Sequence, residues 1–122
     1  MKKLILLTFI VFSINLNAMN FFGMNGKFWN KANDTEKIYY VSAVFDSLAF
    51  HEWKIYNVKL NVKASKKQYI QGIDYIYKDN KNLNIPAVYL IQVVSLQIDG
   101  ASKRDIELLI QRYRKNFVNF YK

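Results

Sequence analysis

Four segments of the chain repeat apolar residues every three or four positions, which is the spacing of one face of an α-helix. They cover residues 34–50, 65–78, 86–100 and 102–122. The third segment is apolar on nearly all sides, as is typical of a helix at the centre of a core. The pattern therefore predicts an all-α fold, a compact domain of four main helices.

Polar residues at the starts of these segments support the same helices. Pairs three positions apart favour capping of free amides at a helix start, and such pairs precede three of the four segments. They are Asn33 with Glu36, Ser65 with Gln68, and Ser102 with Asp105. Pro86 suits the first turn of the third helix, and Gly100 suits the position just after its end.

Small residues within two helices predict close packing. Ala43 and Ser47 lie four positions apart on the first helix, where they would let another backbone approach. Gly72 lies inside the second helix, where glycine costs about 1 kcal/mol relative to alanine. We therefore expect Gly72 to permit a contact that a side chain would block.

Two further segments lack the helical period. Residues 19–32 predict a loop or a short turn of helix whose aromatic side chains dock on the core. Near residues 55–63, apolar and polar positions alternate, which indicates a short strand or an extended connector. One strand cannot form a sheet alone, so we favour the connector. Five aromatic residues lie off the helical stripes and either are buried or line an exposed contact patch: Phe21, Phe22, Phe28, Trp29 and Trp53.

The first eighteen residues have the three parts of a secretory signal. Lys2 and Lys3 precede an apolar run over residues 4–14, and Ala18 ends a short polar stretch. The run is shorter than the roughly 20 residues that a bilayer span needs. We therefore expect a cleaved signal peptide over 1–18, one domain over 19–122, no stable membrane span, and a periplasmic or secreted protein.

Charge narrows the class of partner. The chain holds 18 basic and 9 acidic residues, a net charge of +9, and removal of the two signal lysines leaves +7. Such a charge favours association with anionic partners. An exported protein meets little nucleic acid, so we expect no nucleic-acid partner. An acidic protein partner, a weak association with an anionic envelope surface, and a face kept basic for solubility all remain open.

Several chemistries are disfavoured by composition. The chain has no cysteine, which excludes disulfides and an acylated-cysteine anchor, and His51 is its only histidine. We therefore expect no zinc or other metal site and no cofactor. Asp74 and Asp79 resemble a carboxylate pair for acid-base work on a glycan. Alternatively, Asp79 ends a helix and Asp74 is a solvated surface residue. We favour this second interpretation and therefore expect that the protein is not an enzyme.

Several motifs resemble a family of small exported bacterial proteins of unknown function. The motifs lie at 68–82 (QYIQGIDYIYKDNKN), 85–87 (IPA), 98–100 (IDG) and 113–114 (YR). Trp29 with the sequence EKIYYV at 36–41 is also similar to the helical fold of the Rap/Tai immunity proteins. Those proteins neutralise peptidoglycan-attacking toxins delivered by type VI secretion.

The resemblance implies an exported, non-enzymatic binding protein of the bacterial envelope. Its most concrete form is an immunity-type inhibitor with a protein partner in the periplasm, directed against a secreted cell-wall-degrading toxin. An accessory enzyme or binding factor acting on cell-wall glycan and a basic module on an anionic envelope surface remain alternatives. The candidate binding residues come from the matched motifs and from the basic side of the last helix: Trp29, Asp74, Tyr77, Asp79, Asn82 and Arg112.

Overall fold

The computed structural model describes residues 23–51 and 62–119. Within these ranges the chain forms five α-helices and one short 3-10 helix: α2 (Gly26–Trp29), α3 (Asp34–His51), α4 (Lys66–Tyr77), η2 (Asn80–Asn82), α5 (Ala87–Ile98) and α6 (Lys103–Phe117). The predicted all-α fold and its four main helices are confirmed. The predicted signal peptide, most of the predicted connector, and Phe21, Phe22 and Trp53 lie outside the described residues.

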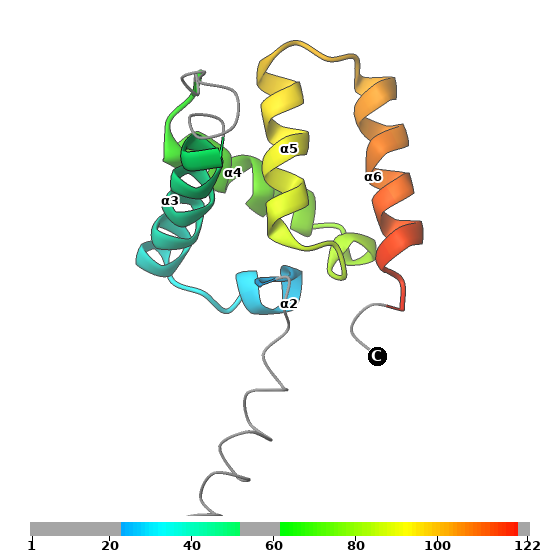
Figure 1. Cartoon of the computed structure of the whole chain (residues 1–122). Coiled ribbons are helices and arrows are strands. Elements are labelled where there is room, and N and C mark those ends of the chain that lie inside the picture. The colour runs from blue at the N-terminus through cyan, green and yellow to red at the C-terminus, as the bar shows by residue number, and fades with distance from the viewer. Residues whose placement is uncertain (1–22, 52–61, 120–122) are drawn as a thin grey trace, which may run out of the picture.

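The main helices follow one another in space as they do in the sequence. Figure 1 shows α5 standing between α3 and α6, with the short α2 below the bundle. Helix α4 packs against both α3 and α5, and α5 packs against α6. The middle of the domain is therefore made by α4 and α5, and α3 and α6 lie on opposite sides.

The core follows the predicted apolar stripes. Helix α5 buries five residues, which confirms it as a central helix: Ala87, Leu90, Ile91, Val93 and Val94. Helix α4 buries five along its length, and α6 buries Ile106, Tyr113 and Phe117. None of the helices in residues 23–51 and 62–119 combines the length and hydropathy that crossing a bilayer requires.

Local signals set the helix ends as predicted. The Glu36 amide donates to the Asn33 side chain at 3.0 Å, and the Asn33 amide donates back to Glu36 at 2.8 Å. Ser65 and Gln68 form the same reciprocal box. At the end of α5, Gly100 has a φ of +84°. Its amide donates to the carbonyl of Gln97, and the next amide donates to Leu96, so a Schellman motif closes the helix.

Gly72 performs the predicted packing role. A Cβ atom added there would lie 2.6 Å from Cγ2 of Val94 on α5. The missing side chain thus lets α4 and α5 approach closely, and this contact offsets the low helix propensity of glycine.

The expected close packing at Ala43 and Ser47 is wrong, because both residues are exposed. Helix α3 turns Val41 to the core, and successive helical residues are rotated by about 100°, so a residue two positions along points outward. Ile38 and Leu48, on the predicted apolar stripe of this helix, are also substantially exposed. The described residues contain no strand, only an isolated bridge between Asn25 and Pro86.

The N-terminal segment is fastened to the middle of the chain. The amide of Ala87 donates to the carbonyl of Met24 at 2.8 Å, and the amide of Gly26 donates to Leu83 at 3.0 Å. Trp29 is fully buried, whereas its neighbour Phe28 is exposed. The predicted short helical turn is therefore confirmed, with Trp29 as the aromatic residue that docks on the core.

Candidate functional site

Two of the six candidate residues meet in a cluster at one end of the bundle, which we call the Trp29 cluster (Trp29, Lys37 and Asp74). The indole Nε1 of Trp29 donates to Oδ1 of Asp74 at 2.7 Å, and Nζ of Lys37 donates to the same oxygen at 2.8 Å. The Lys37 ammonium also lies 5.3 Å from the centre of the Trp29 ring. The cluster joins α2, α3 and α4 through one carboxylate.

The Trp29 cluster is only partly open to solvent. The Lys37 side chain is 12% exposed and that of Asp74 is 41% exposed. A buried indole N–H without an acceptor would carry a desolvation cost. Asp74 avoids this cost by accepting the hydrogen bond of the Trp29 indole N–H. Asp74 thus has a structural use in addition to any contact with a ligand.

Tyr77 is a core residue. Its ring is almost fully buried and lies 6.3 Å from the Trp29 ring between centroids. Its hydroxyl donates to the carbonyl of Ile85 at 2.7 Å, which ties α4 to the segment before α5. This position does not present Tyr77 to a ligand at the surface.

A second cluster forms where α4 ends, and we call it the Asn82 cluster (Asp79, Asn82 and Arg114). Arg114 on α6 donates through Nε to Oδ1 of Asn82 and through Nη2 to Oδ2 of Asp79, both at 2.6 Å. The Asn82 amide nitrogen donates to the carbonyl of Ile76 at 2.8 Å, and Oδ1 of Asp79 accepts from the amide of Lys81. The cluster therefore fixes η2 between α4 and α6.

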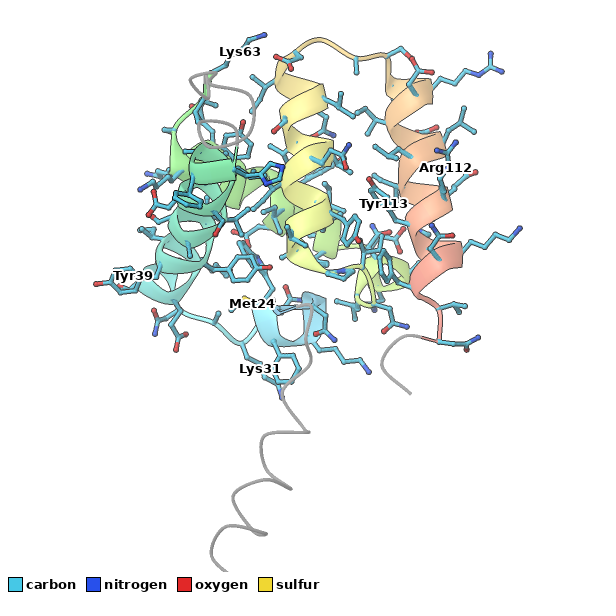
Figure 2. The ribbon with its side chains drawn as sticks, viewed as in Figure 1. Met24, Lys31, Tyr39, Lys63, Arg112 and Tyr113 are labelled. Atoms are coloured by element: carbon cyan, nitrogen blue, oxygen red, sulfur yellow. The ribbon has the colours of Figure 1, made fainter. Side chains whose placement is uncertain are left out.

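Arg112 belongs to neither cluster. It is exposed on α6, whereas Tyr113 lies on the side of that helix that faces α5 (Figure 2). The arginine that reaches Asp79 and Asn82 is Arg114, which was not among the candidate residues. The sequence could have indicated this position of Arg114. It follows Ile110 by four positions and precedes Phe117 by three, so it lies beside the apolar stripe of the helix.

A groove of about 760 Å³ lies beside the Asn82 cluster, between α4 and α6. We call it the α4–α6 groove. Its floor is apolar, and charged or aromatic side chains border it; the floor has Ile76, Ile106 and Ile110, and the border has Tyr75, Lys78, Lys103 and Glu107. Asp79 and Asn82 also line it, and Arg114 fixes both of them. The groove therefore combines apolar and charged contacts on a rigid frame.

A second cleft of about 600 Å³ lies among α3, α4 and α5 and is mostly apolar. Phe45, Leu48 and Ile91 line it, the Tyr69 and Ser95 hydroxyls lie 3.2 Å apart within it, and Val62 stands at its edge. Leu48 and Val62 flank the segment 52–61, which lies outside the described residues. None of the six candidate residues lines this cleft, so the α4–α6 groove is the stronger candidate site.

Two tyrosines near the core, Tyr40 and Tyr113, have raised pKa values. Burial raises the pKa of Tyr40, and hydrogen bonds with the main chain of Met24 and Val88 partly oppose that rise. Burial also raises the pKa of Tyr113. Tyr89 raises this pKa further, and the positive charge of Arg112 lowers it. Both phenols are therefore neutral at physiological pH, and the hydroxyl of Tyr113 donates to Gln92 at 2.7 Å.

The two candidate carboxylates serve different partners. Asp74 holds Lys37, and Asp79 holds Arg114, in separate clusters. Within the described ranges, no three histidine, cysteine, aspartate or glutamate side chains gather as a metal ion would require.

No protein-family model, curated protein or solved structure matches this chain. The fold and the α4–α6 groove therefore carry the functional argument.

Proposed function

We propose that this chain is an exported, non-enzymatic binding protein of the bacterial envelope. Its most concrete version is an immunity-type inhibitor that binds a secreted cell-wall-degrading toxin. The observation that carries the proposal is the α4–α6 groove, where an apolar floor meets exposed charges beside the rigid Asn82 cluster.

The border of the groove has the residue types that protein interfaces favour. Tyr75 is 70% exposed, and the ammonium of Lys78 lies 5.6 Å from the centre of its ring. Tyrosine supplies a large contact area at a low cost in side-chain entropy and is enriched among the residues that dominate binding energy. A segment of a partner protein with an apolar side chain for the floor fits this groove.

The pairing of the carboxylates supports a binding role over glycan hydrolysis. A glycosidase needs one carboxyl group that gives up a proton and a second that acts on the opposite face of the sugar. Asp74 instead accepts hydrogen bonds from Trp29 and Lys37, and Asp79 accepts them from Arg114 and the Lys81 amide. These are the contacts of structural ion pairs.

The proposal is tested by capture from an envelope extract. The full chain, produced by export and tagged at its C-terminus, serves as bait at about 0.3 M salt, where exposed charge pairs are strongly screened. We expect one stoichiometric protein partner with peptidoglycan-degrading activity, which the purified chain inhibits. Tyr75→Ala should weaken binding about tenfold, as for a residue that dominates an interface.

Tyr39→Ala is the matched control. Tyr39 is also 70% exposed, but it points outward from α3 on the far side of the bundle (Figure 2). This variant should bind as the unchanged chain does. Capture of no protein, or equal losses in both variants, contradicts a partner site at the α4–α6 groove. Binding of anionic vesicles alone supports the surface-associated alternative.

A further inference from the structure

The outer side of α6 carries a group of cations around an exposed leucine. Leu108 is 52% exposed, and Arg104, Arg112 and Lys115 are exposed around it. We call these four residues the basic face. Helical residues three or four positions apart are neighbours, so Arg104 and Arg112 lie one turn to either side of Leu108, and Lys115 follows Arg112 by three positions.

The cations of the basic face have no carboxylate partner among the residues that the structure describes. Lys37, Lys63 and Arg114 each hold an aspartate within 2.8 Å, whereas the basic face shares its lack of ion pairs within the described ranges with other exposed lysines such as Lys27, Lys66 and Lys67. The basic face is also firmly supported, since α6 buries Ile106, Tyr113 and Phe117 on its other side. A rigid helix thus presents unpaired positive charge to solvent.

Charge is unevenly distributed across the molecule. Helix α3, on the opposite side of α5, exposes Asp34, Glu36 and Asp46. Helix α6 carries five cations and two acids, whereas α3 carries three acids and Lys37, so α6 is the more positive of the two helices and attracts an acidic partner more strongly.

We propose that the basic face of α6 docks an acidic segment of the partner protein, with carboxylates at Arg104, Arg112 and Lys115 and an apolar side chain against Leu108. This inference rests on the proposed function and extends its interface. Glu107, which borders the α4–α6 groove, lies three positions after Arg104 of the basic face, and side chains at this spacing are neighbours on a helix. The two surfaces are thus continuous along α6.

The chemistry of the basic face favours a protein over an anionic membrane. A cation near an anionic bilayer gains only about fivefold in affinity, so three of them give roughly a hundredfold, too little for stable attachment. Leu108 is a single apolar side chain among them, a small area to insert into lipid. Two of the three cations are arginines, whose planar fork matches a carboxylate or a phosphate with two hydrogen bonds, so the case against lipid rests on the few cations and the small apolar area.

The test uses a displayed library of random peptides selected on the exported full chain. We expect the enriched peptides to carry two or more carboxylates around an apolar residue. In titrations of one enriched peptide, Leu108→Ala should weaken binding about tenfold, and the triple variant Arg104→Glu, Arg112→Glu, Lys115→Glu should abolish it.

The matched control reverses three exposed lysines on other helices: Lys27→Glu, Lys66→Glu and Lys67→Glu. It changes the net charge by the same amount and should retain most of the affinity. Enrichment of peptides without carboxylates, or equal losses in both triple variants, overturns the inference. Binding confined to anionic vesicles or to single-stranded DNA also overturns it.

The same variants separate this inference from the proposed function. If the triple variant of the basic face binds the envelope partner as the unchanged chain does, and Tyr75→Ala binds it about tenfold more weakly, the inference fails and the proposed function stands. If acidic peptides bind the basic face and no envelope protein is captured, the proposed function fails and the acidic specificity of α6 stands.

Discussion

At the scale of single residues, Asn82 shows how a polar side chain is used inside this domain. Only 2% of Asn82 is exposed to solvent. Its amide nitrogen donates to the carbonyl of Ile76, and its oxygen accepts from Arg114. Both ends of the amide are therefore satisfied, which is the condition for burying it without a net cost.

Replacement of Asn82 should destabilise the domain markedly. Asn82→Ala removes the hydrogen bond to the Ile76 carbonyl and the one from Arg114 Nε, and a hydrogen bond is worth about 0.5–1.5 kcal/mol, or about 1.5–3 kcal/mol where one partner is charged. We expect the free energy of unfolding, measured by urea titration, to fall by about 2–3 kcal/mol. Asn80→Ala, at an exposed position of the same 3-10 helix, should change it by less than about 0.5 kcal/mol. Equal effects would mean that the Asn82 cluster contributes no specific stability.

The Asn82 cluster also shows what residue patterns in the sequence can and cannot predict. Asp79 and Asn82 were singled out and do meet, because they lie in one short turn. Their partner is Arg114 and not Arg112, since the direction of a side chain on α6 depends on how that helix rotates against α5. Which arginine reaches Asn82 is determined by the packing of α6 against α5, and this packing cannot be predicted from the local sequence.

At the scale of helices, the contact between α4 and α5 depends on a missing side chain. Gly72→Ala adds a Cβ at 2.6 Å from Val94 Cγ2, and the β-branched Val94 has little freedom to rotate away on a helix. Overpacking typically costs about 1–3 kcal/mol, more than the roughly 1 kcal/mol that alanine gains in helix propensity. We expect a net loss of up to about 2 kcal/mol in the free energy of unfolding.

A second substitution tests whether the steric contact is the cause. In a Val94→Ala background both interfering methyl carbons are gone, so Gly72→Ala should become neutral or stabilising. A double-mutant cycle by urea titration would then give a coupling free energy of about 1–3 kcal/mol. Additive losses would show that Gly72 matters for a reason other than its contact with Val94.

The helices themselves were predictable because their signals are local. The caps at Asn33, Ser65 and Ser102 and the glycine at position 100 act within one turn of the chain, and each functions as the spacing indicated. The prediction at Ala43 and Ser47 failed because small residues permit a close contact but do not say which face of α3 meets a neighbour. That orientation is set by the buried Val41 and by Val44 and Phe45, which pack partly buried against the core.

At the scale of the whole molecule, the candidate binding residues lie in different environments. Trp29, Tyr77 and Asn82 are buried and hold segments distant in sequence together. Arg112 is exposed on α6, where its charge is open to a partner. These residues were grouped as binding candidates from the sequence, and the fold distributes them between the interior and the surface. Only the surface group is expected to change binding without changing stability.

Trp29 connects the N-terminal segment to most of the bundle, so its loss should affect the domain as a whole. Its ring contacts Tyr40 on α3 and Tyr77 on α4, and its indole nitrogen donates to Asp74. Truncating a buried tryptophan costs about 3–5 kcal/mol, a large share of the roughly 5–15 kcal/mol that stabilises a domain. Trp29→Ala should therefore shift the entire urea transition seen by far-UV circular dichroism.

Phe28→Ala is the control within the same short helix, because Phe28 is exposed beside the buried Trp29. It should leave the transition nearly unchanged. If Trp29→Ala instead left the main urea transition unchanged, the N-terminal segment would contribute nothing to the stability of the other helices. A single shifted transition would mean that residues 24–29 fold together with α3, α4 and α5. The α4–α6 groove would then depend on Trp29 for its frame, because α4 forms one wall of the groove and also carries Asp74 and Tyr77.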